Sequence, residues 1–209
     1  MKSLLLFASL TAAAVSAATV SSPSAPAPLT SSASFVEGSS GSYTVDGGHS
    51  SVVFATKHLG VSRFYGRFNE VSGSLELNED DLGQSSITLE IPTASVDSNS
   101  EQRDGHLKSP DFFSAKEFPV ITFESSTIRG TRDAFEIDGE LTLRGVTKTI
   151  TAKGGFVGAG DTMFGDYRCG FEARFTIAAA DYGVPFMKER PNAVGPEVEV
   201  IVSLECVRG

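Results

Sequence analysis

Three histidines, His49, His58 and His106, have the widest chemical repertoire in this sequence of 209 residues. Three imidazoles suffice for a zinc site. His49 and His58, however, are nine positions apart, so on one extended strand they would point to opposite faces. No His-Glu-x-x-His or Cys-x-x-Cys motif accompanies them. We therefore predict no metal site, and we expect these histidines to hydrogen-bond with backbone groups at strand ends and in loops.

Asp104, His106 and Ser109 lie close together in the sequence and are the residue types of a hydrolytic triad. A triad depends on convergence in space, which proximity in sequence does not supply. The chain has no Gly-x-Ser-x-Gly motif, no phosphate-binding loop and no complete dinucleotide fingerprint. We therefore predict a protein that is not an enzyme and that has no resident cofactor.

Cys169 and Cys206 are the two cysteines of the chain. Both fall on the apolar faces of alternating segments, so both are expected to point inward. If the last two strands pair antiparallel with Phe175 opposite Val200, the two cysteines also lie opposite each other, within disulfide distance. The sequence leaves two alternatives open: a disulfide, or two buried free thiols that pack as small hydrophobic side chains.

The charge balance argues against one class of function. The chain has 17 basic and 26 acidic residues, a formal charge of −9 and no block rich in lysine and arginine. A nucleic-acid-binding surface needs a basic face that displaces counterions, so we predict no nucleic-acid partner. Electrostatic adhesion to anionic membranes is disfavoured for the same reason.

The N-terminal residues have the pattern of a secretory signal peptide. Lys2 gives a positive start, an apolar segment follows, and Val15-Ser16-Ala17 offers small residues for cleavage. We predict a signal peptide over residues 1–17, a disordered linker rich in Ser, Pro and Ala over residues 18–41, and a folded domain over residues 42–209. No later apolar stretch is long enough to cross a bilayer. We therefore expect a secreted or periplasmic protein without stable membrane insertion.

The predicted domain alternates between apolar and polar residues along most of its length, which is typical of half-buried strands. The clearest case is the segment 134–143, where Phe135, Ile137, Leu141 and Leu143 share one face. We expect other strands at 51–58, 63–69, 71–77, 86–91, 119–128, 147–157, 171–177 and 198–206, and short helices at 100–107, 109–113 and 178–181.

About eight or nine antiparallel strands, each with one apolar face, predict an all-β domain with one or two short helices. Closure into a barrel, or folding into a sandwich, removes exposed edges and covers the apolar faces. An eight-stranded barrel has an interior that side chains fill or that holds one ligand. Phenylalanine is the dominant bulky residue, with 13 of the 15 in the domain. Alternation is the same in both cases, so the pattern does not decide between a solid core and a cavity.

Several segments, taken in order, resemble the YceI-like family. They are the opening Tyr43-Thr-Val-Asp46-Gly-Gly-His49, then Gly66-Arg67-Phe68, Gly73-Ser-Leu75, Arg103-Asp104-Gly105-His106-Leu107 with Asp111-Phe112-Phe113, Phe118-Pro119-Val-Ile121-Thr122-Phe123, Gly139-Glu-Leu141-Thr-Leu143-Arg144-Gly145, and Asp181-Tyr182-Gly183. Each motif is weak alone, but their order and spacing from about 43 to 207 are specific. In one departure, this chain has Ala179 where the family pattern often has an arginine, which concerns contacts at a cavity mouth more than the fold.

The resemblance implies an antiparallel, lipocalin-like β-barrel with a long apolar tunnel, in an exported protein that binds polyisoprenoid chains or other long amphiphiles. The expected lining consists of the inward apolar residues of the strands, each of which could equally be plain core. These are Phe68, Leu75, Leu77, Ile87, Leu89, Ile91, Ile121, Phe123, Phe135, Ile137, Leu141, Leu143, Phe171, Phe175, Val200 and Val202.

The segment from Arg103 to Phe113 is the candidate lid or rim, because it interrupts the strands with polar and aromatic residues. Arg103, Asp104 and His106 are candidates for contact with a ligand head group, although we favour local ion pairs and caps for Arg103 and Asp104. The prediction is a carrier for an isoprenoid quinone or a fatty-acyl lipid. The alternative is a solid-cored envelope or stress module that acts through its outer surface. The sequence leaves open whether two copies form a homodimer.

Overall fold

The computed structural model of the chain describes residues 37–190 and 192–209. The predicted signal peptide and most of the predicted linker lie outside these residues. The last part of that linker is folded, because the Glu79 carboxylate accepts hydrogen bonds from the backbone of Gly38 and Ser40 and from the Ser39 hydroxyl, each at 2.9 Å. Folded structure is therefore already present a few residues before the predicted boundary at 42.

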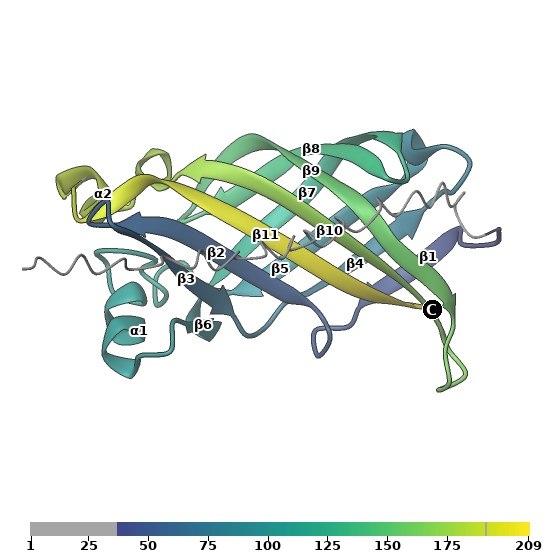
Figure 1. The fold of residues 1–209 in the computed structure, drawn as a ribbon, viewed down its shortest axis with the longest axis horizontal. Coiled ribbons are helices and arrows are strands. Elements are labelled where there is room, and N and C mark those ends of the chain that lie inside the picture. The colour runs from purple at the N-terminus through teal and green to yellow at the C-terminus, as the bar shows by residue number, and fades with distance from the viewer. Residues whose placement is uncertain (1–36, 191) are drawn as a thin grey trace, which may run out of the picture. The chain divides into compact units, whose positions relative to one another are not determined.

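The domain is almost entirely β-structure, with two short α-helices (Figure 1). The strands are β1 (Gly41–Val45), β2 (Ser51–His58), β3 (Ser62–Phe68), β4 (Ser72–Leu77), β5 (Ser86–Pro92), β6 (Val96–Asp97), β7 (Val120–Thr131), β8 (Ala134–Leu143), β9 (Val146–Asp161), β10 (Tyr167–Ala178) and β11 (Val194–Arg208). The helices are α1 (Glu101–Leu107) and α2 (Pro185–Glu189), with 3-10 turns η1 (Leu82–Gln84), η2 (Thr93–Ser95) and η3 (Ala179–Tyr182). No helix among the described residues is both long and apolar enough to pass through a bilayer.

The eleven strands of the described residues form a closed antiparallel barrel of eight barrel strands, three of which are each divided into two segments. β1 pairs with β4 while β2 pairs with β3, so β1 and β2 are two halves of one bent strand and β3 and β4 are the halves of the next. β5 and β6 are likewise two halves, because β5 pairs with β4 and β6 with β3. β7 to β11 then follow as a meander. The predicted barrel is confirmed, and the sandwich alternative is wrong.

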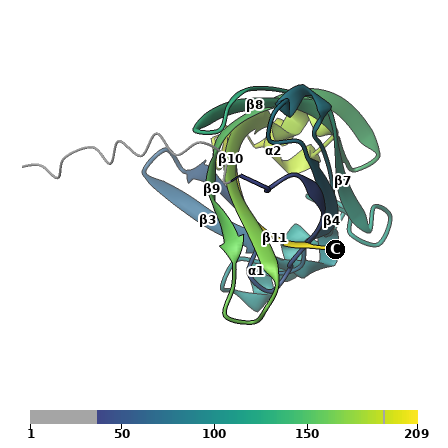
Figure 2. The ribbon, with the colours of Figure 1, turned by 90° about the vertical axis from the view of Figure 1, so that its right-hand side faces the viewer.

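β11 closes the ring, which Figure 2 shows end-on. Its residues Val194–Ser203 pair with β2, and its residues Cys206–Arg208 pair with β1. One long strand therefore pairs with both halves of the first barrel strand, β1 and β2. The sheet is left without a gap where its first and last strands meet.

The sequence pattern located most strands but not every element. β8 and β2 have the predicted bounds, and the others agree to within a few residues except where β9, β10 and β11 run longer. The helix expected at 109–113 is wrong. Those residues form successive turns, in which Ser109 accepts from the Phe112 and Ser114 amides. The segment 178–181 is a 3-10 turn, and both β1 and α2 were not predicted.

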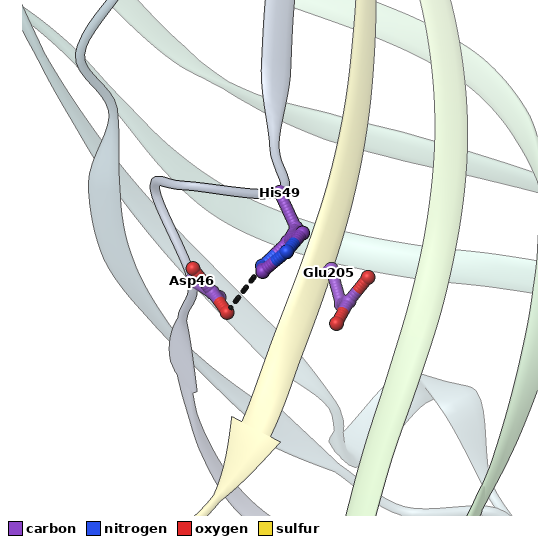
Figure 3. Close-up of side chains that lie close together, drawn as sticks. All are labelled: Asp46, His49 and Glu205. Carbon is purple, nitrogen blue, oxygen red and sulfur yellow. Dashed lines mark hydrogen bonds and ion pairs between the residues drawn. The ribbon is translucent and has the colours of Figure 1, made fainter. Parts of the chain in front are cut away.

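An ion-pair cluster links the bend between β1 and β2 to the last two strands, and Figure 3 shows three of its residues, Asp46, His49 and Glu205. The Arg168 Nη1 atom lies 2.7 Å from Asp46 Oδ2 and 2.5 Å from Glu205 Oε1, and its Nη2 lies 2.9 Å from Asp166 Oδ2. His49 Nδ1 lies 2.9 Å from Asp46 Oδ2. The hydrogen bonds from His49 and Arg168 lower the pKa of Asp46 from 3.8 to about 2.

This lowered pKa predicts a loss of stability in acid. Because the folded-state pKa of Asp46 lies below the unfolded value, its contribution is fully present above about pH 4 and is lost as the pH falls toward 2. Asp46→Asn should reduce the free energy of unfolding by about 1 kcal/mol at neutral pH. It should also flatten the dependence of stability on pH between about 4 and 2.

Urea unfolding at a series of pH values checks this prediction. The matched control is Asp80→Asn, which removes an exposed carboxylate outside the cluster. Equal pH profiles for Asp46→Asn and the unmodified protein would contradict the assignment.

Candidate functional site

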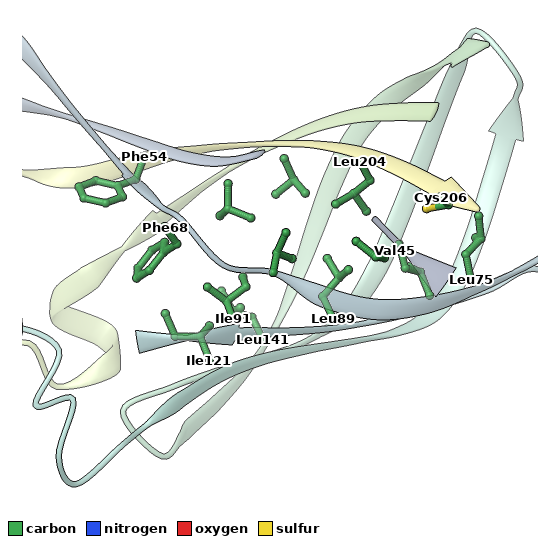
Figure 4. Packing of buried hydrophobic residues seen from close by; sticks show 14 of the residues in the cluster. Val45, Phe54, Phe68, Leu75, Leu89, Ile91, Ile121, Leu141, Leu204 and Cys206 are labelled. Atoms are coloured by element: carbon green, nitrogen blue, oxygen red, sulfur yellow. The ribbon is translucent and has the colours of Figure 1, made fainter. Parts of the chain in front are cut away.

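The barrel encloses a cavity of about 480 Å³. This volume is in the range of small-molecule binding sites. Figure 4 shows side chains from several strands that converge on the barrel interior, from Phe54 and Phe68 at one end to Val45 and Cys206 at the other. The sixteen residues predicted to line a cavity all line it: Phe68, Leu75, Leu77, Ile87, Leu89, Ile91, Ile121, Phe123, Phe135, Ile137, Leu141, Leu143, Phe171, Phe175, Val200 and Val202.

Glycines in the wall help to keep this interior open. Phe54 pairs across β2 and β3 with Gly66, and a Cβ atom at position 66 would lie 2.3 Å from the Phe54 Cζ atom. In the same way, a Cβ atom at position 139 would lie 2.5 Å from the Phe123 Cζ atom. The two aromatic rings therefore lie flat against the sheet, in space that a side chain would occupy in any other residue.

One end of the barrel is filled. Tyr43, Val45, Phe156, Cys169 and Cys206 are all buried in the core, but none of them lines the cavity. The Tyr43 hydroxyl donates a hydrogen bond of 2.5 Å to the Ser39 carbonyl and accepts one of 2.8 Å from Arg208. Burial raises the pKa of Tyr43, in keeping with a phenol that stays neutral in this seal. The cavity therefore ends below these residues.

The predicted register of the two cysteines is confirmed. Phe175 lies opposite Val200 and Cys169 lies opposite Cys206 in the β10–β11 pair. Both are free thiols, so the disulfide that we held as one alternative is not formed in the structure. The hydrogen bond with Cys206, together with burial, raises the pKa of the Cys169 thiol. The pair packs in the seal as two small side chains.

The other end of the barrel carries α1, α2 and the segment 108–118, at the side away from the C-terminus (Figure 1). Aromatic rings connect these elements and line the end of the cavity. The Phe112 and Phe186 rings stack with centroids 4.8 Å apart, and His106 meets them edge-on at 5.0 and 5.6 Å. Phe113 packs against Phe68 with ring centroids 5.4 Å apart. We call this end, with its rings Phe112, Phe113 and Phe186, the aromatic mouth.

The three predicted rim residues have different positions. Arg103 lines the cavity with its guanidinium 4.5 Å from the centre of the Phe64 ring, and its Nε donates to the Ser98 hydroxyl at 2.9 Å. Asp104 does not line the cavity, and its carboxylate accepts a hydrogen bond of 2.8 Å from the Ser98 amide. Asp104 therefore makes the local contact that we favoured, whereas Arg103 makes a local hydrogen bond and also lines the cavity. His106 lines the cavity, and its Nε2 lies 3.0 Å from Asp111 Oδ2.

The charged groups that line the cavity have one sign. Lys57, Arg63 and Arg103 are among the lining residues, together with His58 and His106, and no carboxylate is among them. These groups lie on the end of the β2–β3 hairpin and on α1, on the side of the aromatic mouth. Arg63 forms an ion pair of 2.7 Å with Glu199, and His106 lies 3.0 Å from Asp111, so Lys57 and Arg103 are the lining cations that no carboxylate of the described residues neutralises.

Sequence reasoning missed several aromatic lining residues. Phe54 and Phe64 follow the inward alternation of the strands 51–58 and 63–69, so a complete count of those strands would have included them. Phe186 and Met187 belong to α2, which has five residues and too little periodicity to be recognised. Phe112 and Phe113 fell within the predicted rim but were not identified as lining residues.

Asp46, His49 and Glu205 offer ligand atoms that lie within 4.8 Å of one another, a donor set that can suit a metal ion. Arg168 already binds both carboxylates, and its guanidinium supplies the positive charge that a metal would bring. The cluster lies beside the filled end of the barrel, next to Cys206 in sequence, and none of its residues lines the cavity. Its contacts are those of a structural ion-pair network.

The close approach of Phe54 to Gly66 predicts the effect of a single methyl group. Gly66→Ala should push the Phe54 ring into the cavity, destabilise the protein by about 1–3 kcal/mol and reduce uptake of an apolar fluorescent dye. Gly158→Ala is the matched control, because a Cβ atom at position 158 meets no heavy atom within 4 Å. Thermal unfolding and dye titration measure both effects. If Gly66→Ala behaved like the control, the proposed role of the glycine would be wrong.

Comparisons with known proteins agree with this architecture. The profile of the YceI-like domain matches residues 43–206. A UPF0312 protein of Pseudomonas aeruginosa is 40% identical over 168 residues, which cover 79% of this chain and 86% of that protein. A UPF0312 protein of Yersinia enterocolitica is 37% identical over 171 residues, with the same shares covered.

Solved structures share the fold at low sequence identity. BcnA of Burkholderia cenocepacia superposes with a TM-score of 0.70 at 23% identity, covering 77% of this chain and 98% of BcnA. A domain of Saccharophagus degradans described as polyisoprenoid-binding gives a TM-score of 0.63 at 18% identity, covering 80% and 98%. The barrel, its apolar interior and the extent of the match together lead to one conclusion: this chain belongs to the YceI-like family.

Proposed function

We propose that this protein is an exported, non-enzymatic carrier that holds a polyisoprenoid, such as an isoprenoid quinone, or another long-chain lipid inside its barrel. The observation that carries the proposal is the cavity of about 480 Å³, whose lining is apolar apart from the groups at the aromatic mouth and a few hydroxyl side chains. Burial of apolar ligand surface gives roughly 25 cal/mol per Å² before the costs of association. A long hydrocarbon chain can therefore bind there with few polar contacts.

The ends of the cavity suggest how such a ligand would lie. The seal around Tyr43 and Cys206 closes that end of the cavity, where the hydroxyl of the lining residue Ser85 already accepts a hydrogen bond of 2.9 Å from the Asn78 amide. Arg103, His106 and Lys57 line the opposite end. A chain that enters tail first would keep its head beside the Arg103 and Lys57 cations and the His106 imidazole, within reach of water. The description of the Saccharophagus degradans neighbour as a polyisoprenoid-binding domain supports an isoprenoid chain.

The competing function, a surface-acting module with a solid core, makes a different prediction about overpacking. Ala173 lines the cavity between Phe171 and Phe175 on β10. In a barrel that holds a ligand, Ala173→Phe fills ligand space, so it should weaken lipid binding by more than about ten-fold with less than about 1 kcal/mol change in stability. In a solid core the same substitution should cost about 1–3 kcal/mol.

Thr176→Phe is the matched control, because it adds the same ring to an exposed position of the same strand. Titration of delipidated protein with ubiquinone, a polyprenol and oleate gives the affinities, and urea unfolding gives the stabilities. Equal affinities for Ala173→Phe and Thr176→Phe would contradict binding in the barrel.

The identity of the cargo is tested by extraction. We expect organic solvent to release a stoichiometric isoprenoid or fatty-acyl species, seen by mass spectrometry, from protein purified out of its native compartment. The Ala173→Phe protein should release much less of the same species. An extract without such a lipid, together with no binding of the added lipids, would overturn the carrier and favour the surface-acting module.

A further inference from the structure

The turn between β2 and β3 exposes two apolar side chains at its tip. Leu59 is 59% exposed and Val61 is 83% exposed, and the Val61 amide donates to the His58 carbonyl across the turn at 3.1 Å. We call residues 58–62 the β2–β3 tip. Its apolar side chains contribute nothing to the core, because the buried cluster of the barrel includes neither of them.

The backbone of this tip makes the choice of leucine informative. Leu59 has φ 52° and Gly60 has φ 71°, so both central residues of the turn are left-handed. Left-handed positions in hairpin turns favour Gly, Asn or Asp, because a leucine in this conformation is strained. Because the Leu59 side chain is exposed, packing in the core does not explain why a leucine occupies this strained position. Backbone strain of this kind tends to occur where a residue serves a function.

The β2–β3 tip stands beside the entrance to the cavity. Its first and last residues, His58 and Ser62, line the cavity, as do their neighbours Lys57 and Arg63. The Leu59 amide donates a hydrogen bond of 3.0 Å to the Ala193 carbonyl, which fixes the tip against the start of β11. The exposed leucine and valine are therefore held at a fixed place next to the aromatic mouth.

Two cations flank the tip in a way that suits a lipid surface. Lys57 and Arg63 lie directly opposite each other in the β2–β3 pair, an arrangement that like charges disfavour. The Arg63 side chain is 54% exposed, and its guanidinium forms an ion pair of 2.7 Å with the Glu199 carboxylate. Lys57 is also exposed. An apolar tip bordered by lysine and arginine matches the acyl region and the phosphates of a phospholipid layer.

We propose that the β2–β3 tip inserts Leu59 and Val61 into the surface of a phospholipid bilayer and so brings the aromatic mouth against the lipids. The chain has a net charge of −9, so apolar insertion rather than overall electrostatic attraction holds the protein there. Lys57 and Arg63 contact the lipid phosphates at the same depth. This docking goes beyond the carrier function and requires no cargo.

A second exposed apolar tip provides an internal control. Met163 and Phe164, in the turn between β9 and β10, are 92% and 76% exposed. That turn lies at the filled end of the barrel, where Cys169 pairs with Cys206. Phe164 and Met163 match Leu59 and Val61 in apolar character, but the acidic residues Asp161 and Asp166 flank them and would repel lipid phosphates. Docking through the entrance therefore depends on one tip and not on the other.

The test measures sedimentation of delipidated protein with vesicles of phosphatidylcholine and phosphatidylglycerol. The Leu59→Asn/Val61→Thr variant should partition about ten-fold more weakly, from the loss of buried apolar surface. Its melting temperature should stay equal or rise, because asparagine accepts the left-handed conformation. The Met163→Thr/Phe164→Ser variant should bind as the unmodified protein does, and binding should persist at high salt.

Three results would overturn the proposal. They are no partitioning of the unmodified protein, equal partitioning of the Leu59→Asn/Val61→Thr variant, and binding that high salt abolishes. If the second of these results is accompanied by a loss of self-association, seen by size-exclusion chromatography, the tip belongs to a contact between copies. Leu59 and Val61 do not line the cavity, so the Leu59→Asn/Val61→Thr variant should keep its affinity for ubiquinone and oleate while it loses vesicle binding. Failure of docking is thereby separate from failure of lipid uptake.

Discussion

The pairing of β11 with both β1 and β2 is the contact on which the rest of this structure depends. A sheet of eight strands, each with one apolar face, can surround an interior only if its first and last strands meet. β11 does this with a single run of fifteen residues, which pairs along two halves of a bent partner. The bend at residues 46–50 is held in turn by Asp46, His49 and Arg168. Closure and the ion-pair cluster thus support each other.

The interior is shaped by where its aromatic rings lie. Phe54 and Phe123 lie against glycines of the wall, while Phe156 and Tyr43 fill one end. Rings placed along the wall leave a cavity, and rings placed across the axis close it. The same residue type therefore encloses the cavity along its sides and seals it at one end. The position of a few glycines and of the strand ends decides which role each ring has.

Much of the fold follows from sequence, and the reason is physical. Residues such as Leu75, Leu89 and Leu141 alternate strictly with polar neighbours, and a strand can bury such a face in only one register. The cysteine pair followed from the same logic. Alternation carries no information about depth along the barrel, however. It cannot separate Val45, which lies in the seal, from Val200, which lines the cavity. It also fails for α2 and for β1, because five residues are too few to establish a period.

The cavity also separates the stability of the barrel from the shape of its interior, two properties that are coupled in a solid core. In a close-packed interior, a change of one methylene alters both stability and shape, because every atom has neighbours on all sides. A side chain such as Ile137 or Ala173 has the sheet behind it and the cavity in front. Its volume can change while the strand pairing behind it persists. Such an interior can diverge in the shape of its lumen while its walls are conserved. That freedom offers a physical reason for a shared architecture at a TM-score of 0.70 with 23% identity.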